Sequence, residues 1–153
     1  MKIVFQQITL CNFLSFGYAD IELSDRGYTL VTGINTNVTD NAKSNGAGKS
    51  TIWEGIVWCL TGDTVRGGSK DIRNIHAEDG AYVKLKFTVD NDKYELIRSK
   101  EHSEYKTNLK IYINGEDKSG KGIRDSEKLF SEYLPDLTAS LIGSVIILGQ
   151  GLP

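Results

Sequence analysis

The residues best suited to chemistry lie at positions 44–51, where the sequence reads SNGAGKST. Gly46 and Gly48 have no Cβ, so the backbone there can turn sharply and direct N–H groups at phosphate oxygens. Lys49 adds a positive charge that can reach the outer phosphates, and the Ser50 hydroxyl can coordinate Mg²⁺. The pattern predicts a phosphate-binding loop for ATP and Mg²⁺. The alternative is a glycine-rich turn without a ligand, which the GKST ending disfavours.

The segment after the loop is expected to be the helix that orients it. Residues 51–60 carry apolar side chains at positions 52, 56, 57, 59 and 60, and Thr61 and Gly62 follow as an end signal. The positive end of such a helix would face the nucleotide, with the backbone N–H groups of residues 46–51 around the β-phosphate. Residues 28–32 are expected to form the strand that leads into the loop.

The loop departs from the usual spacing in one respect. The pattern G-x-x-x-x-G-K-[ST] places its first glycine at position 43, which is Lys43 here. Gly33 is the better opening glycine, and residues 36–43 would then be a polar insertion. Residues 115–122 match the glycine spacing more closely. They are the weaker candidate because Gly122 has no hydroxyl for a metal and no apolar helix begins there.

Composition sets the outer limits of the interpretation. The 153 residues are 39% hydrophobic and 25% charged with a net charge of −2, which indicates one domain spanning 1–153. No global basic field favours nucleic acid, so DNA contacts would be local or supplied by other parts of an assembly. Cys11 and Cys59 lie in apolar segments and are expected to be buried thiols. We find no zinc pattern, signal peptide or membrane-spanning run, so we expect a cytoplasmic protein.

The remaining segments predict an α/β fold with a mixed sheet around the loop's helix and an added antiparallel β-meander. The meander is indicated by alternating apolar residues in 83–89, by its partner 94–98, and by 109–113 followed by Asn-Gly. Further expected elements are strands over 2–10, 19–23 and 141–148, a turn over 12–17, and a helix over 125–134 that buries residues 129, 130, 133 and 134. The polar connection 63–80 is locally basic. It is a candidate for nucleotide contact, although solvation alone also explains its charges.

Taken together, these parts resemble the N-terminal lobe of an ABC-type P-loop ATPase head of the SMC-like family. The resemblance is greatest to the SbcC-type DNA repair ATPases and to the large subunits of phage recombination exonucleases. It covers the whole chain. The residues that carry it are Asn12-Phe13-x-Ser15, Val31-Thr32-Gly33-x-Asn35, Asn45–Thr51, Val65-Arg66, Tyr94-x-x-x-Arg98 and Val145–Gly151.

The resemblance implies roles for individual residues. Lys49 and Gln150 would be catalytic, and Ser50 and Gln150 would hold Mg²⁺, with Gln150 also sensing the γ-phosphate. The residues implied in nucleotide binding are Asn45, Gly46, Ala47, Gly48, Lys49, Ser50, Thr51, Arg66, Asn74, Ile75 and His76.

The chain also lacks parts that the family uses. Leu14 stands where many members have an arginine near the nucleotide, and no Walker B Asp-Glu pair or signature motif occurs. We therefore expect these residues to be the first lobe of a longer ATPase that continues into a coiled coil. The implied partners are the C-terminal lobe of the same ATPase, a second head in an ATP-dependent dimer, a nuclease subunit, and DNA bound by the full assembly. No membrane contact is implied.

Three functional hypotheses follow. The first is an ATP-binding lobe of a DNA double-strand-break repair or recombination ATPase that regulates a partner nuclease. The second is the head lobe of a chromosome-organising SMC-type structural ATPase without a nuclease partner. The third is a small P-loop kinase, for which the sequence shows neither a lid nor an acceptor site. Hydrolysis would belong to the full-length protein, and this lobe alone would turn ATP over negligibly.

Overall fold

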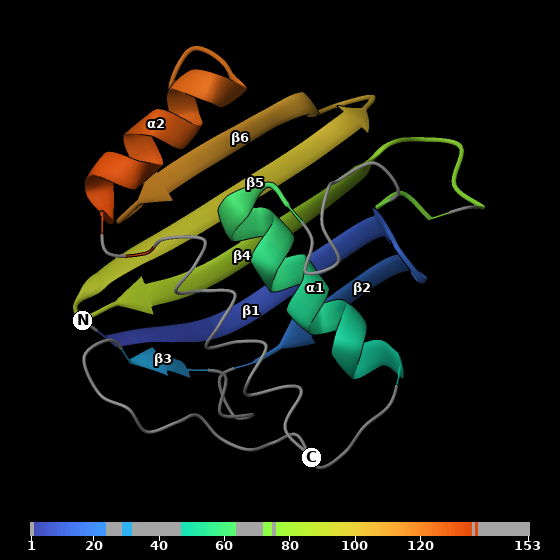
Figure 1. Ribbon diagram of the computed structural model, residues 1–153, viewed down its shortest axis with the longest axis horizontal. Helices are drawn as coiled ribbons and strands as arrows, with labels where there is room; N and C mark the ends of the chain where they lie inside the picture. The colour runs from blue at the N-terminus through green and yellow to red at the C-terminus, as the bar shows by residue number, and fades with distance from the viewer. Residues whose placement is uncertain are drawn as a thin grey trace.

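The computed structural model describes residues 2–23, 29–31, 47–63, 72–74, 76–135 and 137, without the side chains of 29–31 and 47–50. Seven strands and two helices lie in these ranges (Figure 1). In chain order they are β1 (Lys2–Phe13), β2 (Phe16–Glu22), β3 (Thr29–Val31), α1 (Ala47–Thr61), β4 (Ala81–Val89), β5 (Asp92–His102), β6 (Lys106–Ile113), β7 (Glu116–Asp117) and α2 (Ile123–Tyr133).

The strands form one sheet in the order β2-β1-β4-β5-β6-β7, with β3 paired to β1. The antiparallel meander over β4, β5 and β6 is confirmed, and Asn114 and Gly115 turn the chain with φ of 52° and 86°. Positive φ at both positions is what a tight hairpin turn requires. Every pairing among the described strands is antiparallel, so the parallel pairings that a mixed sheet would contain are absent from this part of the chain.

Strand β1 is longer than the sequence indicates. It continues through Asn12 and Phe13, which were expected to lie in a turn, and the chain reverses only at Leu14 and Ser15. Phe13 is fully buried and pairs with Phe16, and this anchoring in the core extends the strand. Asn12 and Leu14 take positive φ values of 54° and 51°, a conformation that asparagine tolerates better than leucine. The expected turn over 12–17 is therefore wrong except at its middle.

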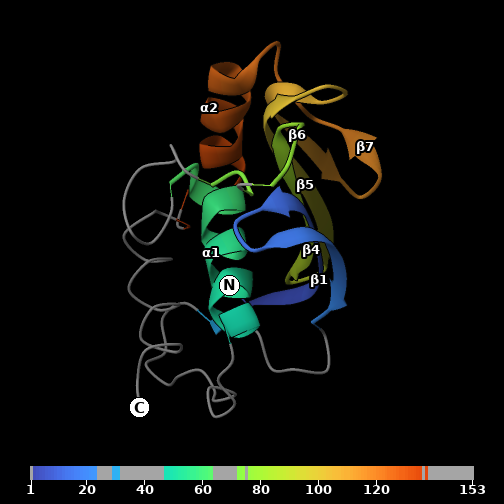
Figure 2. The ribbon, with the colours of Figure 1, turned by 90° about the vertical axis from the view of Figure 1, so that its right-hand side faces the viewer.

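Both helices cover the same face of the sheet (Figure 2), and α1 packs on β1, β4 and β5 while α2 packs on β6. Every side chain from residue 51 to 60 is buried, so this part of α1 lacks the exposed stripe of an amphipathic helix. Gly55 allows its close approach to β1, because a Cβ there would lie 2.6 Å from Leu10 Cδ2. Helix α2 buries Phe130 and is followed by the buried Leu134. Tyr133, expected in the core, is 38% exposed because it lies at the edge of the helix face that Ser126 and Phe130 bury.

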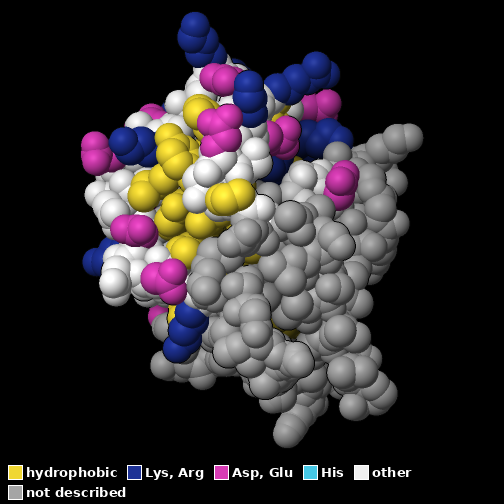
Figure 3. Space-filling model, turned by 60° about the vertical axis from the view of Figure 1, so that its left-hand side comes forward, with side chains coloured by type: hydrophobic (Ala, Val, Ile, Leu, Met, Phe, Trp, Pro, Cys, Tyr) yellow, Lys and Arg dark blue, Asp and Glu magenta, His cyan; other side chains and the backbone are white. Residues whose placement is uncertain are grey.

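The face of the molecule in Figure 3 carries no dominant charge. Lys, Arg, Asp and Glu side chains are interspersed around an apolar area on the face in Figure 3. This mixture agrees with the net charge of −2 and gives no single-sign field on that face. None of the helices in the described ranges is long and apolar enough to cross a membrane.

Candidate nucleotide-binding site

The N-terminus of α1 lies where the sequence places the phosphate loop. The helix begins at Ala47, directly after Gly46, so the N–H groups of residues 47–50 have no acceptor within the helix. These groups and the helix dipole give this end a partial positive charge that suits a phosphate. The donor set therefore fits a nucleotide phosphate. The side chains of Ala47, Gly48, Lys49 and Ser50, and the whole of Asn45 and Gly46, lie outside the described residues, so their contacts stay predictions.

Thr51 is the first residue of this helix whose side chain is described. It is buried, and its Oγ1 lies 3.3 Å from Oγ of Ser15 in the turn between β1 and β2. The two hydroxyls can hydrogen-bond with either as the donor. This contact fixes the first turns of α1 against the hairpin formed by β1 and β2.

The same hairpin turn also holds residues 72–74. The Leu14 N–H donates to the Ile72 carbonyl over 2.6 Å, and the Asn74 N–H donates to the Asn12 carbonyl over 2.8 Å. The Asn12 side-chain amide donates to the Gly80 carbonyl over 3.0 Å. The positive φ of Asn12 and Leu14 orients the turn for these bonds. The hairpin turn thus contacts both α1 and the segment that contains Asn74.

Asn74 and His76 form a compact local turn. The Asn74 Oδ1 accepts a hydrogen bond from the His76 N–H over 2.8 Å, which is an Asx turn. Asn74 is half-buried and His76 is exposed. The structure therefore places Asn74 beside the turn that contacts Thr51. Ile75, Arg66 and Gln150 lie outside the described residues, and their predicted roles are neither supported nor contradicted.

A carboxylate fixes the far end of this segment. Asp79 accepts hydrogen bonds from the Ser103 hydroxyl over 2.7 Å and from the Ser103 N–H over 2.8 Å, and His102 Nε2 lies 3.4 Å from its Oδ2. The pKa of Asp79 is lowered, first by the Ser103 hydroxyl and then by the Gly80 N–H. These contacts tie the segment to the hairpin of β5 and β6, so it is held at both ends.

The structure argues against the second glycine-rich stretch as a phosphate loop. Gly115 lies in the β6–β7 turn, and the amides further along are already engaged by α2. The Gly120 N–H donates to Ser126 Oγ over 2.8 Å, and the Lys121 N–H donates to Asp125 Oδ2 over 3.0 Å. These side chains occupy the amides that a phosphate would need.

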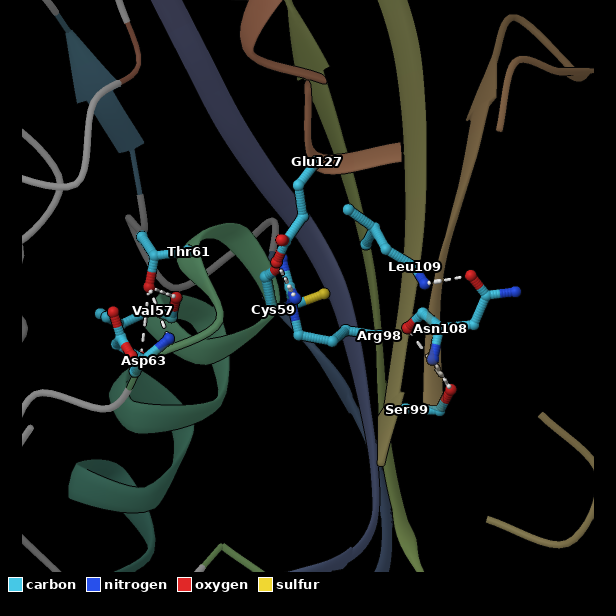
Figure 4. Close-up of polar contacts among 9 residues, drawn as sticks. All are labelled: Val57, Cys59, Thr61, Asp63, Arg98, Ser99, Asn108, Leu109 and Glu127. Atoms are coloured by element: carbon cyan, nitrogen blue, oxygen red, sulfur yellow. Dashed lines mark hydrogen bonds and ion pairs between the residues drawn. The ribbon is translucent and has the colours of Figure 1, made fainter. Parts of the chain in front are cut away.

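The opposite end of α1 carries a contact that the sequence analysis missed. Arg98 is only 3% exposed on the core face of β5, and its Nε donates to the Cys59 carbonyl over 3.1 Å. One of its terminal nitrogens donates to Glu127 Oε2 over 2.7 Å (Figure 4). The only sequence signal is a charged residue at a core position of an alternating strand, and that signal does not identify the partners. Both expected magnesium ligands, Ser50 and Gln150, have side chains outside the described part. Within that part, no three His, Cys, Asp or Glu side chains gather as a metal site would need.

Comparison with known proteins gives the family and the fold. A family model described as an AAA domain matches residues 7–151. A structure of the recombination mediator protein RecF with ATP aligns with a TM-score of 0.51 and 20% identity, over 79% of this chain and 29% of that chain. A structure of an SMC ATPase, from work on ATP-driven dimerization and DNA-stimulated activation, aligns with a TM-score of 0.42 and 15% identity. That alignment covers 98% of this chain and 81% of the other.

The fold comparison rests on RecF. This chain spans less than a third of the length of the RecF chain. The shared arrangement is that of an ABC-type ATPase head, which confirms the α/β fold class expected from the sequence. The family match covers nearly the whole chain. The chain belongs to the AAA domain family.

Proposed function

We propose that this chain is the ATP-binding lobe of an SMC- or RecF-like ATPase that acts on DNA. The observation that carries the proposal is the start of α1 at Ala47, which places the N–H groups without an acceptor in the helix within the G-A-G-K-S-T sequence itself. RecF, whose fold is shared, was solved with ATP, and this supports the same ligand here. More narrowly, we propose a repair or recombination ATPase of the phage exonuclease type whose nucleotide state regulates a partner nuclease.

The chain's own residues have distinct parts in this proposal. The amides of residues 46–51 bind the β-phosphate, and Lys49 neutralises charge that develops on the outer phosphates. Ser50 and Gln150 hold Mg²⁺, which supplies charge neutralisation when bound. Asn74 and His76, in the segment that the β1–β2 turn holds, contact the base, ribose or phosphate. The carboxylate that orients the attacking water comes from the C-terminal lobe, and a second head completes the site from the opposite face.

Substitution of one lysine in each glycine-rich stretch tests which stretch is the phosphate loop. ATP with Mg²⁺ is titrated into the wild-type chain, Lys49→Ala and Lys121→Ala by calorimetry. Lys49→Ala should abolish binding because the predicted loop loses its charge, whereas Lys121→Ala should bind like wild type because this exposed residue lies beside engaged amides. Equal losses from both substitutions, or no binding by wild type, would refute the assignment.

The proposed regulation of a partner nuclease needs a separate test, because this chain covers only part of an ATPase head. Zinc-hook cysteines in the coiled coil of the full-length protein would support the repair assignment. A folded hinge domain there would instead support chromosome organisation.

A further inference from the structure

The C-terminal end of α1 is capped by a residue from outside the helix. The last turn of α1 contains no basic residue to offset the negative end of the helix dipole. The Gly62 N–H donates a hydrogen bond to the Trp58 carbonyl over 2.8 Å. Arg98 of β5 donates to the next carbonyl along the helix, that of Cys59. The cation that a helix usually carries in its own last turn is therefore supplied by the sheet.

The position of Arg98 depends in turn on α2. Glu127 is the charged partner of Arg98, with 2.7 Å between Oε2 and the guanidinium. The Arg98 side chain is 4% exposed and that of Glu127 is 42% exposed, so the pair runs from the core to the surface. Arg98 donates to the carbonyl from Nε and to the carboxylate from a terminal nitrogen, whereas lysine would have to reach both acceptors from a single nitrogen.

Gly62 shows how closely this junction is packed. Its φ is +85°, and a Cβ there would lie 3.1 Å from a terminal Arg98 nitrogen and 3.2 Å from Glu127 Oε2. The end of α1 contacts Arg98 through the Cys59 carbonyl, and a side chain at position 62 would meet Glu127 as well. A shift of α2 that moves Glu127 must either move Arg98 and the end of α1 or break a charge-assisted hydrogen bond.

We propose that Arg98 is a positioning residue for the nucleotide-binding helix and that Glu127 sets its place, so that the position of α2 regulates ATP affinity. The proposal rests on the proposed function, because it assumes that ATP binds at the N-terminus of α1. It assigns a regulatory role to α2, whose exposed side is open to contact by other parts of an assembly.

The decisive variant is Glu127→Ala, with Glu132→Ala as the matched control. Both remove one negative charge from α2, but Glu132 is exposed and lies outside the junction. ATP with Mg²⁺ is titrated well below the unfolding temperature of each variant. Glu127→Ala should weaken binding by about twofold to thirtyfold, the range of energetic coupling measured for mutations in packed networks. Glu127→Gln keeps the acceptor and should restore affinity to near the wild-type value. Arg98→Lys keeps the positive charge but not the two hydrogen bonds, so its ATP affinity should stay below the wild-type value.

Three results would overturn the proposal. If only long-range charge matters, both alanine variants should bind the ATP anion slightly more tightly, which is the opposite sign. If the pair serves stability alone, Glu127→Ala should unfold at a lower temperature and bind ATP with unchanged affinity. If Arg98 does not transmit the effect, Glu127→Ala should weaken binding as much in an Arg98→Met background as in wild type.

A readout without nucleotide separates this proposal from the function on which it rests. Amide hydrogen exchange over residues 51–60 should be faster in Glu127→Ala than in Glu132→Ala or wild type, and by a larger factor than exchange over the central strand β4, which reports the loss of global stability. Unchanged exchange would count against the link even where ATP binds. Failure of wild type to bind ATP, with faster exchange in Glu127→Ala, would refute the proposed function while the mechanical link stands.

Discussion

Cys59 should make the protein less stable in alkali. Its thiol is fully buried, and its Sγ lies 3.5 Å from the Val83 carbonyl and 3.9 Å from the Leu96 carbonyl. Burial raises the pKa of Cys59 from 9.0 to about 12, against a smaller lowering by the nearby Arg98. Above pH 9 the unfolded chain loses this proton and the folded chain keeps it, so stability falls as pH rises toward 12. The expected slope is about 1.4 kcal/mol per pH unit from this group.

The measurement compares wild type with Cys59→Ser in urea unfolding at several pH values. Serine keeps a small donor near the same carbonyls but does not titrate in this range, and all other groups are shared. Wild type should lose about 2 kcal/mol more than the variant between pH 8 and pH 10.5. The tyrosines cancel in this difference, including Tyr82, whose pKa is raised to about 12 mainly by burial. Parallel stability curves for the two proteins would refute the burial argument.

Three further predictions concern packing, charge and activity. Gly55→Ala should destabilise the protein by about 1 kcal/mol in urea, because overpacking against β1 exceeds the gain in helix propensity; Gly17→Ala, with no atom within 4 Å of its Cβ, is the control. Glu127→Ala should lower the free energy of unfolding by about 2 kcal/mol, because Arg98 stays buried without its charged partner. Arg98→Met should lower it by less, since it removes the buried charge; the reverse order in urea would contradict this reasoning. ATP turnover by the chain alone should be negligible in a phosphate-release assay. The C-terminal lobe should restore it, and Gln150→Ala should then reduce turnover more than binding; steady turnover without that lobe would show that a catalytic carboxylate has been overlooked.

Local sequence signals identify most of the described strands. Strict alternation in 83–89 and the Asn-Gly pair at 114–115 depend only on neighbours in sequence, and they correctly predict the β4–β5 and β6–β7 hairpins. The register of β1 is harder to predict, because a bulge between Phe5 and Gln7 shifts the alternation by one residue. After the bulge Ile8 and Leu10 face the core, so one periodic pattern cannot describe the whole strand.

The contacts around the candidate site depend on the tertiary fold. Arg98 is separated from Cys59 by 39 positions and from Glu127 by 29, so no local pattern connects them. The hydrogen bonds of residues 72–74 to the β1–β2 turn likewise form only when β4 pairs with β1. The sequence could predict that a phosphate loop precedes a helix, but it could not predict what holds each end of that helix.

The burial of α1 on all sides determines how its phosphate-facing end can respond to forces elsewhere. A helix with an exposed stripe can fray or bend, and it then absorbs a displacement locally. In α1 every side chain from residue 51 to 60 is buried, so local opening must expose core surface and approaches the free energy of global unfolding. At 1.5 Å per residue, Cys59 lies about 18 Å along the axis from the N-terminal amide of Ala47. Because the helix cannot yield between residues 51 and 59, a displacement at the Arg98 contact moves Thr51 and, with it, the start of the helix. The hydrogen bond between Thr51 and Ser15 opposes that movement, so variants at Ser15 should alter ATP affinity in the same assay as variants at Glu127.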